Sequence, residues 1–309
     1  MFEQKTLRGE TVFEGHGLHS GKSVRLRVLP APPNTGIQFV RTDLNHHAIP
    51  ARREYLEATH LSTTLGRNGI QVGTVEHLLA AFAGLAIDNA RAELDGPEVP
   101  ILDGSAFPFV EAFQEVGLLR QDSPRSFLTI LKPVMVGDGD KRLAVFPSND
   151  FRITYAIDFR HPAIGYQERE FSISGHLFAE EIAPARTFCL FRDVEEMRRQ
   201  GLALGGDLDN AVVVGDDGVL TGTLRYQDEF VRHKILDLIG DLSLIGRPVR
   251  GHLVAFKGGH RLHAALVHRL LESPEAWTLS AGREPLPRQL LMGFDRQKAT
   301  FLPGQALTA

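Results

Sequence analysis

The pattern of apolar and polar positions divides the first third of the chain into strands followed by helices. Apolar and polar residues alternate over 24–29 and 37–40, which predicts two strands. A Leu- and Ala-rich run from Val75 to about Ala86 predicts a helix with Thr74 as its N-cap. The elements expected next are a strand over 89–94 and a helix over about 106–116, with Ser105 as N-cap and Gly117 as C-cap.

The same order of elements returns in the rest of the chain. The clearest helix is expected from about Asp228 to Ile245, because its apolar residues recur at helical spacing. A further helix is expected to open at His260. The other predicted elements are strands over 127–132, 143–146, 151–159, 210–214 and 252–256, and a short helix over 193–200. Each half of the chain therefore ends in a helix, a strand and a helix.

A polar segment separates these two halves. Residues 121–126 are polar and include a proline, so we interpret them as a linker. Strands grouped before helices favour an α+β fold over a βαβ winding. We therefore expect two similar α+β domains, residues 1–122 and 127–309.

Size and composition fit a globular protein of two domains. The chain has 309 residues, of which 43% are hydrophobic and 23% are charged, and two domains of roughly 100–200 residues each would account for this length. A net charge of −4 without a Lys/Arg block argues against nucleic acid as a partner. The single cysteine, Cys189, allows neither an internal disulfide nor a thiolate-rich zinc site.

The sequence shows neither a signal peptide nor a membrane-spanning segment. No apolar stretch follows a basic cluster near the N-terminus. The most apolar run, Leu78 to Ile87, is about half as long as the roughly 20 residues that a bilayer-spanning helix needs. We therefore expect a soluble, cytoplasmic protein.

The helix expected over 228–245 carries candidate metal ligands on its polar side. His233 and Asp237 are four residues apart, so their side chains point the same way and can chelate one ion. Asp241 cannot join them, because its Cα lies about 12 Å along the axis from that of His233 at about 1.5 Å per residue. A solvated polar face is the alternative interpretation of this pattern.

Glu76 and His77 begin the earlier helix among apolar residues, where a charged pair needs a partner or a function. His77 would complete a set of two histidines and one aspartate, and three protein ligands plus a water are the pattern of catalytic zinc. Glu76 would then stand beside the metal as a general base. Alternatively, Glu76 is simply an acidic residue near the positive end of the helix dipole.

A glycine-rich turn, Lys257-Gly258-Gly259, leads into the helix that opens at His260. Glycines let the backbone approach a ligand closely. The helix dipole disfavours a protonated imidazole at a helix start, and a neighbouring carboxylate would restore the proton. Asp241 is the candidate partner, and with it His260 would serve as an acid for a leaving amine. A turn histidine exposed to water is the alternative.

Several short motifs occur together in one order along the chain. They are Thr74-Val75-Glu76-His77-Leu78, Asp103-Gly104-Ser105-Ala106, Ala185-Arg186-Thr187-Phe188, Gly205-Gly206, Val231-Arg232-His233-Lys234-Ile235-Leu236-Asp237 and Gly259-His260. In this combination, over roughly residues 2 to 300, the chain resembles the UDP-3-O-acyl-N-acetylglucosamine deacetylases, which are zinc enzymes of lipid A (lipopolysaccharide) biosynthesis.

The resemblance implies a fold of two α+β domains, each a sheet packed on two helices, with the active site between them. It implies a Zn2+ ion bound by His77, His233 and Asp237. Four residues match positions that act on the reacting amide: Glu76 as general base, His260 as general acid, Asp241 as the partner of that histidine, and Thr187 as a donor to the tetrahedral oxyanion.

The resemblance also implies how the substrate, an acylated UDP-sugar, is bound. The substrate-contacting positions correspond to His19, Phe159, Phe188, Lys234 and Lys257. Among these, Phe159 matches a contact to the nucleotide, and the two lysines could hold the diphosphate by charge. The insertion over about 188–214 corresponds to an apolar passage for the fatty acyl chain. Cys189 stands there where some relatives have glycine, which bears on the width of the passage.

The implied reaction is hydrolysis of the N-acetyl amide, which yields a free amine and acetate, by a monomeric enzyme. A zinc amidohydrolase acting on a different acylated amine would share the metal site but not the acyl passage. A non-catalytic protein with a structural zinc would need four protein ligands, and the sequence offers three. Iron can fill a similar set of ligands in place of zinc.

Overall fold

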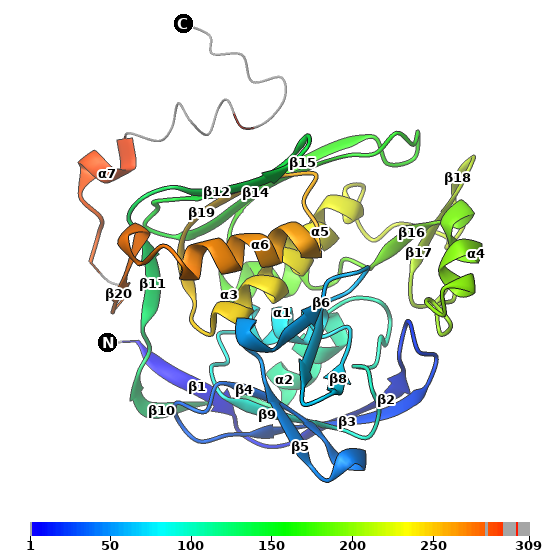
Figure 1. Cartoon of the computed structure of the whole chain (residues 1–309), viewed down its shortest axis with the longest axis horizontal. Helices are drawn as coiled ribbons and strands as arrows, with labels where there is room; N and C mark the ends of the chain where they lie inside the picture. Colours follow the sequence, from blue (N-terminus) through cyan, green and yellow to red (C-terminus); the bar gives the residue numbers. More distant parts are fainter. Residues whose placement is uncertain (1, 282–283, 293–300, 302–309) are drawn as a thin grey trace, which may run out of the picture.

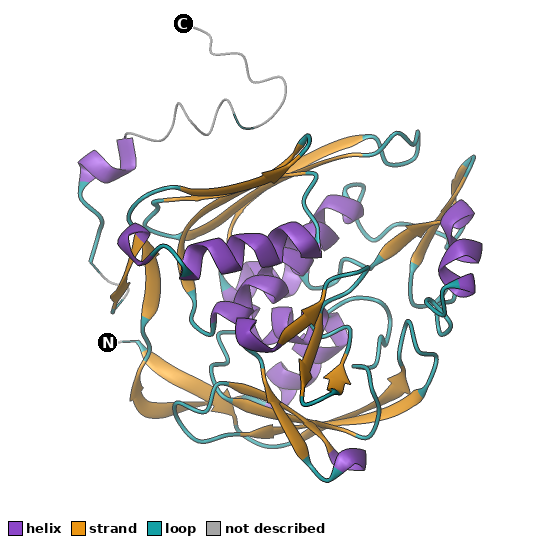
Figure 2. Cartoon of the chain, viewed as in Figure 1, coloured by secondary structure: helices purple, strands orange, loops and turns teal. Residues whose placement is uncertain are grey.

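The computed structural model describes residues 2–281, 284–292 and 301, and the fold is α+β, as the sequence predicts (Figure 1). Two sheets form the outer layers of the molecule. Most of the helices lie between these sheets, as the purple elements of Figure 2 show. The site described below lies among these central helices.

The N-terminal outer layer is a five-stranded sheet with the order β2–β3–β9–β4–β5. Its strands are β2 (Thr11–His16), β3 (Ser23–Pro30), β4 (Ile37–Arg41), β5 (His47–Pro50) and β9 (Ala90–Leu94). A separate pair, β1 (Glu3–Leu7) and β10 (Leu118–Pro124), runs antiparallel beside it. Alternating burial along β3 matches the alternation of its sequence, because one face of the sheet covers the core.

The C-terminal outer layer is a seven-stranded sheet built around β19 (Val249–Phe256). All eight residues of β19 are buried, since β13 pairs with one edge of it and β14 with the other, and β11 pairs with its first two residues. The other strands are β11 (Phe127–Ile130), β12 (Val134–Asp138), β13 (Lys141–Phe146), β14 (Phe151–Asp158), β15 (Tyr166–Ser172) and β20 (Trp277–Ser280).

Two three-stranded sheets complete the strands. One contains β6 (Leu56–Ala58), β7 (Thr64–Arg67) and β8 (Ile70–Val72). The other contains β16 (Phe188–Leu190), β17 (Val212–Gly215) and β18 (Gly218–Val219). The second sheet and helix α4 (Phe191–Arg199) lie together at one side of the molecule (Figure 1). They form the insertion that the sequence places at about 188–214.

The remaining helices are α1 (Glu76–Gly84), α2 (Phe107–Val116), α3 (Gly175–Leu177), α5 (Glu229–Leu242), α6 (His260–Leu271) and α7 (Arg288–Met292). Short 3-10 turns cover Thr42–Leu44, Arg53–Tyr55, Ser243–Ile245 and Pro274–Ala276, and a π-helical turn covers Phe178–Ile182. The order α1–β9–α2 in the first half and α5–β19–α6 in the second confirms the predicted repetition of helix, strand and helix.

The predicted N-cap of α1 is wrong. Thr74 has a left-handed backbone with φ 52°, and its hydroxyl donates to the Glu98 carboxylate at 2.7 Å instead of accepting from the helix. The Thr74 hydroxyl is therefore used for a hydrogen bond to a buried carboxylate and does not cap the helix. The prediction for α2 is closer to the structure, because Ser105 Oγ accepts from the N–H of Phe107 and Gly117 follows the helix with φ 79°.

The predicted linker is also largely wrong. Residues up to Pro124 belong to β10, and only two residues separate this strand from β11. Polar residues fit there because β10 pairs with β1 alone and stays partly exposed along its length. Gln121, for example, donates to the carbonyl of Ala31 at 2.8 Å. The division into domains 1–122 and 127–309 stays our interpretation.

A large apolar core runs through the middle of the molecule. It includes Leu79 of α1, Phe109 of α2, Leu236 of α5 and Leu266 of α6. Helix α1 packs on α5 within this core, so helices from the two halves of the chain lie against each other. This contact decides which polar side chains can meet.

Candidate metal and catalytic site

The three predicted metal ligands come together between α1 and α5. His77 Nε2 lies 3.8 Å from Asp237 Oδ1, and His233 Nε2 lies 3.2 Å from the same oxygen. One ligand atom from each residue lies within 4.8 Å of the others, and all three side chains are buried. The i, i+4 spacing of His233 and Asp237 places both on one side of α5, as predicted.

The chemistry of these three side chains suits a divalent cation. His233 Nδ1 donates to the carbonyl of Ala185 at 3.0 Å, so its lone pair is on Nε2, which faces the other ligands. Burial and the neighbouring His233 lower the pKa of His77 to about 3, which keeps this imidazole neutral. Asp237 Oδ1 accepts no hydrogen bond from the described residues, although it is buried. Two imidazole nitrogens and a carboxylate oxygen without a hydrogen bond are donors typical of zinc sites.

A glycine allows the two helices to meet so closely. A Cβ added to Gly240 of α5 would lie 2.1 Å from the carbonyl oxygen of Glu76, the first residue of α1. No side chain fits in that space, because real Cβ contacts are longer than 3.0 Å. The start of α1, with Glu76 and His77, is therefore held directly against α5.

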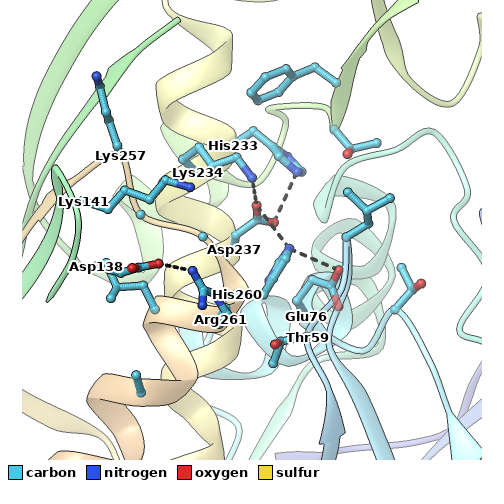
Figure 3. Close-up of a pocket in the computed structure, with 18 of the residues that line it drawn as sticks. Thr59, Glu76, Asp138, Lys141, His233, Lys234, Asp237, Lys257, His260 and Arg261 are labelled. Carbon is cyan, nitrogen blue, oxygen red and sulfur yellow. Dashed lines mark hydrogen bonds and ion pairs between the residues drawn. The ribbon is translucent and has the colours of Figure 1, made fainter. Parts of the chain in front are cut away.

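Glu76 and His260 face each other across the site (Figure 3). His260 Nε2 lies 3.9 Å from Glu76 Oε1 and 3.9 Å from Asp237 Oδ2. The other oxygen of Glu76, Oε2, accepts from the backbone N–H of Thr63 at 3.0 Å. Burial raises the pKa of Glu76 to about 8, against the opposing effect of His260. His260 thus lies between the Glu76 and Asp237 carboxylates, 3.9 Å from each.

Asp241 is the hydrogen-bond partner of His260, as the sequence predicts. Its Oδ2 lies 2.8 Å from His260 Nδ1. Burial alone would lower the pKa of His260, but Asp241 and Asp237 raise it to about 9. The imidazole is therefore protonated at neutral pH, and Nε2–H points into the site.

Sequence reasoning missed two residues that bind the same carboxylate. His263 Nδ1 lies 2.7 Å from Asp241 Oδ2, and the Thr63 hydroxyl donates to Asp241 Oδ1 at 2.5 Å. His263 lies three residues after His260, and this spacing on one helix face was a usable signal. Thr63 precedes β7 within a polar run, which gives no signal of its own.

A cavity of about 600 Å³ opens beside these groups. Four of the five predicted substrate-contacting residues line it, namely His19, Phe188, Lys234 and Lys257. The fifth, Phe159, is not among the lining residues and packs edge-on against Phe188, with ring centroids 5.6 Å apart. Lys141 and Arg261 are further lining cations that sequence reasoning missed. In Figure 3, Lys141 and Lys257 lie on the side of the cavity away from Glu76.

Both predicted lysines have acidic neighbours. Lys257 Nζ lies 2.9 Å from Asp140 and 3.0 Å from Asp158, and these carboxylates raise the pKa of the lysine. Lys234 Nζ donates to Asp237 Oδ2 at 2.7 Å. An anionic ligand would therefore compete with carboxylates for both ammonium groups.

The segment Ala185–Thr187 is held in place at the edge of the cavity. Glu229 is fully buried and accepts from the backbone N–H of Arg186 at 3.0 Å and from its Nε at 2.8 Å. The same segment supplies the carbonyl that orients His233. Thr187, the last residue of the segment, lines the cavity.

The insertion begins at the cavity with Phe188 of β16. Cys189 is the next residue and is partly buried, and burial raises the pKa of its thiol. A raised pKa keeps a thiol protonated, which fits a passive apolar role better than that of a nucleophile.

Among the described residues, no helix combines the length and apolar character that crossing a membrane requires.

Comparisons with known proteins agree with the resemblance inferred from the motifs. The family model described as UDP-3-O-acyl N-acetylglycosamine deacetylase matches residues 4–272. A UDP-3-O-acyl-N-acetylglucosamine deacetylase of Myxococcus xanthus is 50% identical over 295 residues, which cover 95% of this chain and 94% of the relative. Proteins of the same name from Geobacter sp. strain M21 and Acidithiobacillus ferrooxidans are 48% and 49% identical, over 90% of this chain and 92% of each relative.

Proposed function

This chain belongs to the UDP-3-O-acyl-N-acetylglucosamine deacetylase family, and from that premise we propose that it removes the acetyl group from an acylated UDP-N-acetylglucosamine. The reaction hydrolyses an amide and serves lipid A biosynthesis. The observation that carries the proposal is the convergence of His77, His233 and Asp237 beside His260, which in turn lies 3.9 Å from Glu76.

We propose that His77, His233 and Asp237 hold a zinc ion. Bound there, zinc supplies Lewis-acid chemistry, which polarises the amide carbonyl and makes water a better nucleophile. Three protein ligands leave an open position for this chemistry, as in other catalytic zinc sites. The orphaned Oδ1 of Asp237 supports this ligand set.

Glu76 acts as the general base in this proposal. Its Oε2 is bound to the N–H of Thr63, so Oε1 is the atom that takes a proton from the attacking water. Water adds to the acetyl carbon, and the carbonyl oxygen becomes an oxyanion. The Thr187 hydroxyl is the proposed donor to that oxyanion.

His260 acts as the general acid. Its Nε2–H faces Glu76 Oε1 across the site, and Asp241 supports the positive charge through Nδ1. When the carbon–nitrogen bond breaks, this proton passes to the departing sugar nitrogen. The products are acetate and the free amine.

The remaining contacts are proposed to bind the substrate outside the reacting amide. Lys234 and Lys257, with the lining cations Lys141 and Arg261, would hold the diphosphate by charge. Phe159 is proposed as a contact to the nucleotide, while His19 and Phe188 border the sugar and its acyl chain. The insertion over about 188–214 would enclose that chain, with each buried methylene adding about 0.8 kcal/mol to binding.

A deacetylation assay on an acylated UDP-N-acetylglucosamine, with and without a chelator, tests this function. We expect free amine to form, and turnover to stop when the chelator removes the metal and to return when zinc is added. A metal-independent reaction, or none, contradicts the proposal. Equal turnover of the unacylated nucleotide sugar would instead favour an amidohydrolase with another substrate. The monomeric state stays a prediction from the family, and the cytoplasmic location stays a prediction from the sequence.

A further inference from the structure

Asp241 is a convergence point for three hydrogen bonds in a buried place. Its Oδ2 accepts from His260 Nδ1 at 2.8 Å and from His263 Nδ1 at 2.7 Å, and its Oδ1 accepts from Thr63 Oγ1 at 2.5 Å. Only His260 of these three donors also reaches the cavity. The other two therefore act on the carboxylate, not on a ligand.

Thr63 binds both halves of the proton-transfer machinery. Its backbone N–H donates to Glu76 Oε2 at 3.0 Å, while its hydroxyl donates to Asp241 Oδ1. The residue is 1% exposed and lies in the loop before β7, outside the two helices that carry these acids. One residue thus fixes the position of the proposed base relative to the partner of the proposed acid.

His263 supports the same carboxylate from the other side. Burial lowers the pKa of His263 in spite of the adjacent Asp241, so its ring is neutral and Nδ1 is the donor. The Tyr155 hydroxyl can then donate to His263 Nε2, from which it lies 3.1 Å. A Cβ on Gly258 would meet this tyrosine oxygen at 2.5 Å, so the glycine turn before His260 rests directly on the pair.

We propose that Thr63 and His263 are positioning residues that hold the Asp241 carboxylate in one orientation, which keeps His260 Nε2 aimed at the cavity. This inference rests on the proposed function, because it assigns His260 the role of acid. Nothing in it requires Thr63 or His263 to touch the substrate.

The physical reason lies in the freedom of the carboxylate. With one donor, Asp241 can rotate about its side-chain bonds and carry the His260 ring with it. Donors on both oxygens remove that freedom before the substrate arrives, so proton transfer needs no rearrangement. Partners of this kind, one step removed from the reacting groups of metal sites, typically matter about 10- to 100-fold.

Paired substitutions test the proposal. Thr63→Val keeps the shape and the backbone N–H but removes the hydroxyl, and His263→Leu removes the donor. We expect each to lower kcat about 10- to 100-fold while KM and metal content stay at the wild-type values. Thr63→Ser and His263→Asn retain a donor at the same place, and we expect them to restore most of kcat. A merely structural role would not predict this rescue.

Matched control variants lie nearby. Thr154 is a buried threonine of β14 whose hydroxyl donates to Glu170 on the sheet, and His268 is a histidine of α6 that pairs with Arg53. Thr154→Val and His268→Leu should leave kcat within about twofold, because the hydrogen bonds of Thr154 and His268 go to residues other than Thr63, His263 and Asp241.

Wild-type kcat in both Thr63→Val and His263→Leu would overturn the proposal, as would failure of Thr63→Ser to restore turnover. If His263→Leu does not fold, comparison of Thr63→Val with Thr63→Ser still tests the proposal. If the wild type does not deacetylate the substrate, the proposed function fails. A crystal structure of Thr63→Val then tests the positioning role independently of activity. The proposal expects the Asp241 carboxylate and the His260 ring to have turned, and unmoved side chains would contradict it.

Discussion

The pKa values of Glu76 and His260, the proposed base and acid, are both raised, but by different causes. Burial makes the charged form of Glu76 costly and raises its pKa to about 8. For His260, the cost of burial is outweighed by Asp241 and Asp237, and its pKa rises to about 9. A cation held by the nearby ligands would lower the pKa of Glu76, because an opposite charge favours the carboxylate. Metal binding and base strength are therefore coupled in this site.

Substitution of Glu76 separates metal binding from proton transfer. Glu76→Gln keeps the shape of the side chain but cannot accept the proton, so we expect kcat to fall about 10²- to 10⁴-fold. The three ligands are unchanged, so metal content measured by elemental analysis should stay at one ion per chain, as proposed. Glu93→Gln, at an acid that pairs with arginines on the N-terminal sheet, is the control. Full turnover in Glu76→Gln would show that Glu76 is not the general base.

The charge of Asp241 should be visible in the pH dependence of turnover. In the proposed role as general acid, His260 works in its protonated form, so we expect activity to fall as pH rises through its pKa. Asp241→Asn removes the negative charge that raises this pKa, and we expect the alkaline limb of the pH–rate profile to move to lower pH. The profile of kcat over about pH 6–10 measures the shift. An alkaline limb at the wild-type pH would show that Asp241 does not set the pKa of His260 during turnover.

Among the elements, helices were predicted better than the loops that join them. The apolar stripe of α5 is local information, so its sequence alone predicts both the helix and the shared side of His233 and Asp237. His260 at the start of α6 follows from the glycine turn before it. Thr63 could not be predicted, because its role depends on two acids that are distant in sequence and meet only in the fold.

Gly240 shows how one helix position sets the distance between two elements. In an isolated helix, Gly→Ala is stabilising by about 1 kcal/mol. Here the new Cβ would lie 2.1 Å from the carbonyl oxygen of Glu76, which is backbone and cannot move alone. We expect Gly240→Ala to cost about 1–3 kcal/mol of stability, measured by denaturant unfolding, and to lower metal affinity by displacing α1 from α5.

The control for this prediction is Gly175→Ala in α3, where the nearest atom to the new Cβ is 3.5 Å away at ordinary contact distance. We expect little change in that variant. A Gly240→Ala protein as stable as wild type, with unchanged metal affinity, would show that α1 and α5 can separate without harm to the site.

At the scale of the whole molecule, the candidate site is assembled from both halves of the chain. His77 comes from the first half, and His233 and Asp237 come from the second. Local sequence patterns predict the α+β elements of each half, but they carry no information on which helices pack together. The contact of α1 with α5 arises from the shared apolar core, and only the complete fold places the imidazole of His77 beside the other ligands.

This assembly predicts that metal stabilises the whole chain against unfolding. A cation that binds the folded state alone contributes about 2.7 kcal/mol at 100 times its Kd. Because the ligands belong to both halves, neither half can unfold without losing the ion. We expect zinc to raise the Tm measured by calorimetry by several degrees and a chelator to reverse the change. In His77→Ala, which leaves both ligands of α5 intact, the rise should shrink sharply. An equal rise in that variant would mean that the ion binds to the second half alone.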